Sequence, residues 1–156
     1  MSTTSVLAPV AGRAVPLSDV PDPVFSAGMV GHGAAVDPPH EVIDAVAPVS
    51  GKLLKLLPHA FVVMTADNVG VLVHLGIDTV ALNGEGFTTH VTQGDDVSAG
   101  QKVITYDVPA IAAKGLNPIV PVVVMDEREP DNITPAGPVL EGAAVAPGDE
   151  LFTARK

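Results

Sequence analysis

Short apolar segments alternate with glycine- and proline-containing turns along the whole chain. In the clearest example, residues 59–65 and 71–75 are rich in β-branched and apolar residues, and residues 66–70 between them have turn chemistry. This pattern predicts a β-hairpin. In an antiparallel pair, its histidines His59 and His74 lie opposite or diagonal to each other on one face. Both imidazoles are therefore expected to reach a single ligand.

Further strands are expected wherever β-branched and apolar residues recur between turn residues. Residues 19–25 contain two prolines, which exclude a regular ladder, so an irregular surface turn is expected there. Residues 31–33 and 37–40 also have the composition of turns. The expected strands cover residues 6–9, 13–17, 42–48, 52–57, 87–91, 102–106, 120–125 and 151–154.

One short helix is expected within this β pattern, at residues 108–114. Asp107 can cap its start, Pro109 suits its first turn, and Gly115 can end it. The predicted fold is all-β: an antiparallel β-sandwich or barrel with this one short helix. Such an architecture hides the strand edges that so many strands would otherwise expose.

The chain has 156 residues, which is long enough to bury one core. A single domain over residues 1–156 is therefore expected, with residues 1–4 flexible. Recurring motifs predict pseudo-repeated strand units within it. The motifs are APVAGR at 8–13 with APVSGK at 47–52, and VTQGDDV at 91–97 with VAPGDEL at 145–151.

Composition and charge exclude several classes of function. The chain has no cysteine, which excludes disulfides, thiolate chemistry and cysteine zinc sites. Its net charge of −10 would repel nucleic acids and anionic membranes and favours a basic protein partner. The first residues lack the features of a signal peptide, and no apolar run approaches about 18 residues. We therefore expect a cytoplasmic protein without a direct membrane anchor or a nucleic-acid partner.

Three interpretations of the histidine pair remain open on the residues alone. In the first, one neutral imidazole takes a phosphoryl group and the other hydrogen-bonds to it. In the second, both bind a catalytic zinc with Asp67 or Asp78 as third ligand, although no HExxH or HxH spacing is present. In the third, the histidines only hydrogen-bond within the core of a binding module. The residues favour phosphoryl transfer modestly.

The segment HLGIDTVALNGEGF at 74–87 strongly resembles the glucose-family enzyme IIA of the bacterial phosphoenolpyruvate:sugar phosphotransferase system. The resemblance covers nearly the whole chain. Chance agreement over so many ordered segments is negligible. Further matching segments are DVPDPVF at 19–25, APVSG at 47–51, HAF at 59–61, PVVVM at 121–125 and GDELF at 148–152.

The resemblance implies a phosphocarrier. Members of this family accept phosphate from the phosphohistidine of the carrier protein HPr and pass it to a cysteine on the IIB domain of a glucose- or N-acetylglucosamine-type permease. By this resemblance, His74 is the phosphorylated residue and attacks through Nε2. His59 donates a hydrogen bond to the phosphoryl group, and the carbonyl of Gly76 holds the Nδ1 proton of His74.

The resemblance also implies a docking surface for protein partners. Asp22 and Asp78 match carboxylates that meet a basic surface of HPr. No cofactor is required, although some relatives share a zinc ion with a partner through the residues matching His59 and His74, and some act on regulatory targets. The segment before His59 is shorter than in enteric members and lacks their supporting threonine. The apolar ring around the site matches Val24, Phe25, Met29, Val30, Leu72 and Val80.

Overall fold

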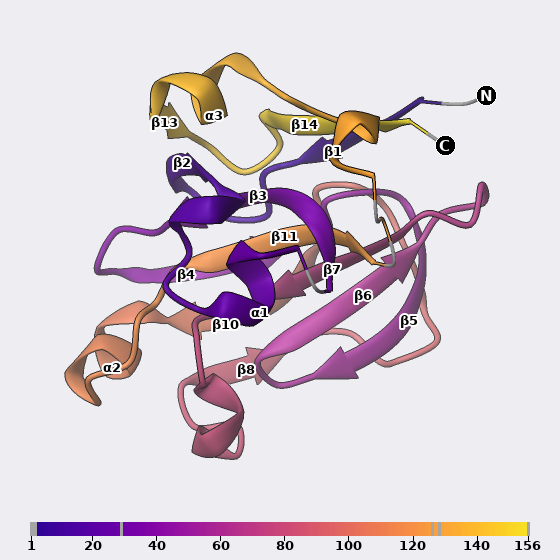
Figure 1. The fold of residues 1–156 in the computed structure, drawn as a ribbon. Coiled ribbons are helices and arrows are strands. Elements are labelled where there is room, and N and C mark those ends of the chain that lie inside the picture. Colours follow the sequence, from indigo (N-terminus) through magenta and orange to yellow (C-terminus); the bar gives the residue numbers. More distant parts are fainter. Residues whose placement is uncertain (1–2, 29, 126, 128, 156) are drawn as a thin grey trace.

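The computed structural model describes the chain except for residues 1–2, 29, 126, 128 and 156 (Figure 1). Antiparallel strands dominate it. The strands are β1 (Thr3–Leu7), β2 (Gly12–Pro16), β3 (Gly31–Asp37), β4 (Val42–Val46), β5 (Gly51–Leu57), β6 (Ala60–Met64), β7 (Gly70–His74), β8 (Phe87–Thr89), β9 (Asp96–Val97), β10 (Lys102–Asp107), β11 (Val120–Met125), β12 (Ile133–Pro135), β13 (Ala144–Val145) and β14 (Glu150–Arg155). The helices are α1 (Pro23–Ser26), α2 (Val108–Ala113) and α3 (Gly137–Glu141), with 3₁₀ turns η1 (Leu17–Asp19), η2 (Thr79–Leu82) and η3 (Pro130–Asn132).

The strands form one large sheet and two small ones. The large sheet has the order β13-β2-β3-β11-β7-β6-β5-β9, and the small sheets have the orders β1-β14-β12 and β4-β10-β8. Figure 1 shows β1 and β14 side by side, with the two chain ends close together. A single main cluster of buried residues includes side chains from all three sheets, such as Phe61, Tyr106 and Phe152. The predicted all-β antiparallel architecture is confirmed.

The core is made mainly of valine, alanine, leucine and isoleucine, as the composition requires. The central strand β11, with the sequence VPVVVM, is buried at every position from Val120 to Val124. Each fully buried valine contributes about 1.5–3 kcal/mol relative to an exposed one. No helix among the described residues is long and apolar enough to cross a membrane.

The prediction of turns at 31–33 and 37–40 was wrong for most of its length, because Gly31–Asp37 forms β3 in the middle of the large sheet. Glycine is needed here for close approach to a neighbouring strand. A Cβ on Gly33 would lie 2.0 Å from the carbonyl oxygen of Val122 on β11. Glycines inside a strand can mark such a contact as well as a turn.

The prediction of a single helix was also wrong, since three short α-helices occur among the described residues. The expected one, α2, is present, and Asp107 Oδ1 accepts a hydrogen bond from the Ala110 amide at 3.1 Å. The proline-containing segment expected as an irregular turn holds α1, where Asp22 Oδ1 accepts from the Val24 amide at 2.9 Å. Pro23 at its first turn explains why this helix forms.

Residues 1–4 were expected to be flexible, but Thr3 and Thr4 pair with Arg155 and Ala154 in a regular ladder. Residues 1 and 2 lie outside the described residues. The first and last strands, β1 and β14, therefore stabilise each other within one small sheet.

The strands of the described residues form two copies of a seven-strand unit. We call β4–β10 the histidine repeat, and β11–β14 with β1–β3 the terminal repeat. Taken in the order β1, β2, β3, β11, β12, β13, β14, the terminal repeat reproduces every strand pairing within β4 to β10. Reciprocal hydrogen bonds join the two, from Leu7 N to Pro48 O at 2.9 Å and from Val46 N to Pro9 O at 2.8 Å.

The first predicted motif pair, 8–13 with 47–52, occupies equivalent places in the two repeats. The second pair was wrong in register. Val145 pairs with Gly12 just as Val97, rather than Val91, pairs with Gly51. The true equivalent of 145–151 is therefore 97–103.

Candidate functional site

His59 and His74 meet at one end of the β6–β7 hairpin, as the sequence predicted. His74 ends β7 and pairs with Ala60, the first residue of β6. His59 directly precedes β6, and its carbonyl accepts a hydrogen bond from the Leu75 amide at 2.7 Å. The two ring centroids are 5.1 Å apart and the ring planes form an angle of 72°. One imidazole thus presents its edge to the other.

A backbone carbonyl sets the protonation of His74. Its Nδ1 lies 2.5 Å from the carbonyl oxygen of Gly76, two residues along the chain. A carbonyl oxygen can only accept, so Nδ1 carries the proton of the neutral ring. The other ring nitrogen, Nε2, is then left with its lone pair.

Burial keeps both imidazoles neutral near pH 7. It lowers the pKa of His74, and the Gly76 carbonyl, Asp22 and Asp78 oppose this shift only in part. Burial also lowers the pKa of His59, and the nearby His74 lowers it further. A neutral imidazole with a free nitrogen is a competent nucleophile without a separate base.

Apolar side chains surround the two rings. Phe25 of α1 stands beside His74, with ring centroids 5.2 Å apart, and only 7% of Phe25 is exposed. It is therefore a buried wall of the site and not an exposed part of the predicted ring. Val24 and Val80 are the exposed members, at 44% and 63%. Leu72 and Val30 are half-buried and pack against the cluster that contains Phe25.

Met29, also predicted for this ring, lies outside the described residues. Sequence reasoning missed Leu57, which is 39% exposed and pairs with Ala60 next to the histidines. Its position just before Pro58 and His59 was the available signal. This exposed leucine extends the apolar surface on the side away from α1.

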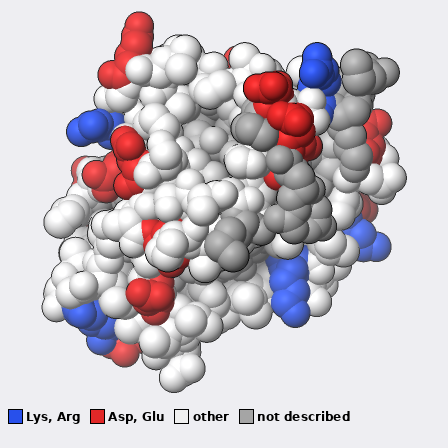
Figure 2. All heavy atoms as spheres, viewed as in Figure 1, with Lys and Arg blue, Asp and Glu red and all other residues white. Residues whose placement is uncertain are grey.

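The two predicted carboxylates flank the site from different repeats. Asp22 caps α1, and Asp78 has a left-handed backbone with φ of 62°. Both raise the pKa of His74 through their charge, which places them within electrostatic reach. Figure 2 shows uncharged residues dominating the face around α1, with acidic atoms among them and basic atoms toward its edges.

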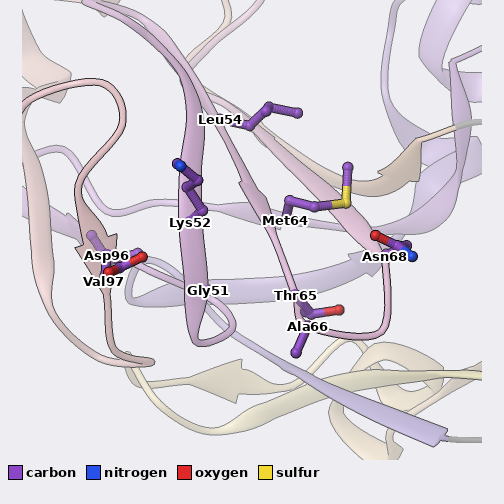
Figure 3. Close-up of a pocket in the computed structure, with 9 residues that line it drawn as sticks. All are labelled: Gly51, Lys52, Leu54, Met64, Thr65, Ala66, Asn68, Asp96 and Val97. Carbon is purple, nitrogen blue, oxygen red and sulfur yellow. The ribbon is translucent and has the colours of Figure 1, made fainter.

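A groove of about 570 Å³ lies at the other end of the same hairpin. In Figure 3, Lys52, Leu54 and Met64 border it, and Asp96 faces it from β9. Met64 pairs with Gly70, four residues along β7 from His74, which corresponds to about 13 Å. The groove is therefore separate from the histidine pair.

Among the described residues, the zinc interpretation finds no third ligand. No group of three histidine, aspartate or glutamate side chains suited to a metal ion occurs within the described part of the chain. Asp67, one proposed ligand, lies in the turn at the far end of the hairpin from His74. Two imidazoles alone are one protein ligand fewer than catalytic zinc normally takes.

Comparison with known proteins gives one consistent result. Residues 4–129 match the family model described as phosphoenolpyruvate-dependent sugar phosphotransferase system, EIIA 1. The chain is 41% identical over 134 residues to the glucose-specific EIIA component of Oceanobacillus iheyensis, covering 83% of this chain and 80% of that protein. It is 44% identical over 119 residues to the mannose-specific EIIBCA component of Corynebacterium glutamicum, where 76% of this chain aligns with 17% of that longer protein.

A solved structure agrees with these relatives. The glucose permease IIA from Mycoplasma capricolum superposes with a TM-score of 0.86 at 34% identity. The match covers 98% of this chain and 96% of that one. The shared architecture therefore extends over both repeats.

Proposed function

We propose that this chain, which belongs to the EIIA 1 family of the phosphoenolpyruvate-dependent sugar phosphotransferase system and is therefore a phosphotransferase, carries its phosphoryl group on Nε2 of His74. The hydrogen bond from Nδ1 to the Gly76 carbonyl is the observation that carries this proposal, because it leaves Nε2 as the nucleophile. The neutral state favoured by burial keeps that lone pair available.

In the proposed step, the Nε2 lone pair bonds to the phosphorus of the phosphohistidine of HPr. The P–N bond to the donor ring breaks, and its electron pair returns to that ring. Each imidazole keeps the proton on its other nitrogen. In the second step, a cysteine thiolate of a IIB domain bonds to the phosphorus. The bond between phosphorus and Nε2 of His74 breaks, and its electron pair returns to the His74 ring, which is again neutral and protonated at Nδ1.

His59 positions the phosphoryl group in this scheme. Its ring stands edge-on to His74 at 5.1 Å, so a ring N–H can donate to a phosphoryl oxygen. The arriving negative charge favours the cationic form of His59 and opposes the lowering of its pKa by burial. The charge-assisted hydrogen bond is therefore strongest when the phosphoryl group is present.

The surface around the histidines is the proposed docking site for both HPr and the IIB domain of a glucose- or N-acetylglucosamine-type permease. Exposed Val24 and Val80 supply apolar contact, and Asp22 and Asp78 orient a basic partner. The fused EIIBCA relative supports the IIB assignment. The cytoplasmic location belongs to the same proposal, because the relay needs all its proteins in one compartment.

Incubation with phosphoenolpyruvate, enzyme I and HPr tests the carrier assignment. The chain should gain one acid-labile phosphate, and His74→Gln should abolish it. His90→Gln is the matched control, since His90 is exposed and hydrogen-bonds to Thr105 away from the site. Labelling that survives His74→Gln would reject the proposal.

The two alternatives make different predictions. A regulatory binding protein would hold its partner without passing phosphate to any IIB domain. A zinc hydrolase would contain tightly held stoichiometric zinc. We propose that the relay itself needs no cofactor, and the zinc shared with a partner through His59 and His74 stays a prediction of the family resemblance.

A further inference from the structure

We infer that Tyr106 and Thr79 are positioning residues for the phosphoryl transfer: together they fix the Gly76 peptide whose carbonyl holds the Nδ1 proton of His74. This inference rests on the proposed role of His74 as the carrier. Neither residue touches an imidazole in the described contacts. Both act through the backbone on the tautomer of the reactive ring.

Tyr106 acts through the segment 117–119. Its hydroxyl donates to the carbonyl oxygen of Pro118 at 3.0 Å. The carbonyls on either side of Pro118 accept from the turn after His74: Ile119 O accepts from Gly76 N at 3.1 Å, and Asn117 O accepts from Ile77 N at 2.9 Å. Tyr106 thus holds the middle of a segment that accepts hydrogen bonds from the Gly76 amide and from the Ile77 amide. These are the two peptide groups on either side of the Gly76 Cα.

Thr79 acts from the other side of the same turn. Its hydroxyl donates to the carbonyl oxygen of Leu75 at 2.8 Å, and the residue is fully buried. The Leu75–Gly76 peptide is therefore bound at both ends, through its oxygen by Thr79 and through its nitrogen by Ile119. Because this peptide is held at both ends, the Gly76 carbonyl that follows it has little freedom to rotate.

Close packing leaves no free space beside the Cα of Gly76. Gly76 has φ of +84°, and a Cβ on it would lie 2.6 Å from the Thr79 methyl carbon and 2.9 Å from the Tyr106 hydroxyl oxygen. The two side chains therefore lie directly against the Gly76 Cα. Phe87 stacks on Tyr106 with centroids 5.4 Å apart, which holds the phenol ring in place. If the Gly76 carbonyl turned away, Nδ1 would lose the acceptor that selects its protonated form.

Histidine labelled with nitrogen-15 gives the direct test. Two-bond proton–nitrogen correlation spectra at mildly alkaline pH distinguish an imidazole protonated at Nδ1 from one protonated at Nε2. The wild-type His74 should be protonated at Nδ1 alone. Tyr106→Phe and Thr79→Val should each give a mixture of tautomers, because each removes one hydroxyl while keeping the side-chain shape.

The rate of phosphate acceptance should change with the tautomer. Loss of one such hydrogen bond should slow acceptance from phospho-HPr roughly 3- to 10-fold. For Tyr106→Phe the loss should fall on kcat, with KM for HPr unchanged, since the docking surface is intact. Thr79→Ser restores the hydroxyl and should return both the tautomer and the rate toward wild type.

Thr105→Val is the matched control. Thr105 hydrogen-bonds to Asp44 and His90, so this variant should alter the spectrum of His90 and leave His74 and the rate unchanged. The inference is overturned if His74 stays wholly Nδ1-protonated at wild-type rates in both test variants. If one variant does not fold, the other decides, because they act on opposite sides of Gly76. Labelling that survives His74→Gln would instead reject the carrier assignment, whatever the spectra show.

Discussion

The histidine repeat and the terminal repeat place equivalent strand pairs next to each other at the centre of the large sheet, yet they carry different residues at matching positions. Gly33 pairs with Val123 in the terminal repeat as Ala60 pairs with His74 in the histidine repeat. His32 is therefore the counterpart of His59, but Val123 occupies the position that corresponds to His74. The fold is duplicated, and the proposed site is not.

The connections that precede His59 and its counterpart His32 also differ. In the histidine repeat, β5 and β6 are joined directly through Pro58 and His59. In the terminal repeat, the corresponding connection holds α1, which brings Phe25 against His74. His32 packs over the α1 end instead, since a Cβ on Gly28 would lie 2.4 Å from its Cε1. One repeat thus supplies the imidazoles and the other supplies a wall.

Among the substitutions that test this difference between the repeats, replacement of His59 is expected to have the largest effect on phosphate transfer. His59→Gln should still accept phosphate but pass it on about 10²-fold more slowly or worse, because the phosphoryl group loses a positioned donor. Rapid-quench transfer from the phosphorylated variant to a IIB domain measures this. His32→Gln, at the matching position of the terminal repeat, is the control and should transfer normally. Equal donor rates for His59→Gln and wild type would contradict the positioning role.

The equivalent positions Gly33 and Ala60 should differ in how much stability a substitution costs. Gly33→Ala should lower the free energy of unfolding by about 1–3 kcal/mol, because the added methyl collides with the Val122 carbonyl. Ala60→Gly should cost about 0.5–1 kcal/mol, as usual for glycine inside a strand. Urea denaturation compares the two. A Gly33→Ala variant as stable as wild type would contradict the close approach of β3 to β11.

Acidification should lower both the rate of phosphate acceptance and the folding stability, through the two histidines of the histidine repeat. Burial lowers the pKa of both His74 and His59 from 6.5, so the acceptance rate should be flat above that pH and fall as acid protonates His74. The folded state binds fewer protons than the unfolded state in this range, so stability is lost as pH falls from 6.5 toward the lowered values. His59→Gln should lose less stability. Stability that rises on acidification would contradict this.

Removal of one flanking carboxylate should have the smallest effect. Asp22→Asn, in the terminal repeat, should slow association with phospho-HPr a few-fold at low salt, and Asp78→Asn, in the histidine repeat, should act similarly. Both effects should shrink at high ionic strength. Stopped-flow association rates at two salt concentrations measure this. An Asp22→Asn effect that is independent of salt would point to loss of the α1 cap instead of loss of steering.

Local signals in the sequence were sufficient to predict part of the structure. The alternation of apolar stretches and turns predicted the all-β fold and the hairpin that brings His59 and His74 together. Asp107, Pro109 and Gly115 predicted α2, because capping depends on residues within one turn. These features need only neighbours close in sequence, and the family resemblance assigned roles to the histidines.

Contacts between distant segments were decided by the tertiary structure alone. Gly31–Asp37 forms a central strand because β11 lies against it, and Phe25 is buried because α1 folds across to His74. The frame made by Tyr106, Pro118 and Gly76 joins three separate segments. No local pattern encodes such contacts, because they depend on which strands become neighbours when the two repeats pack around one core.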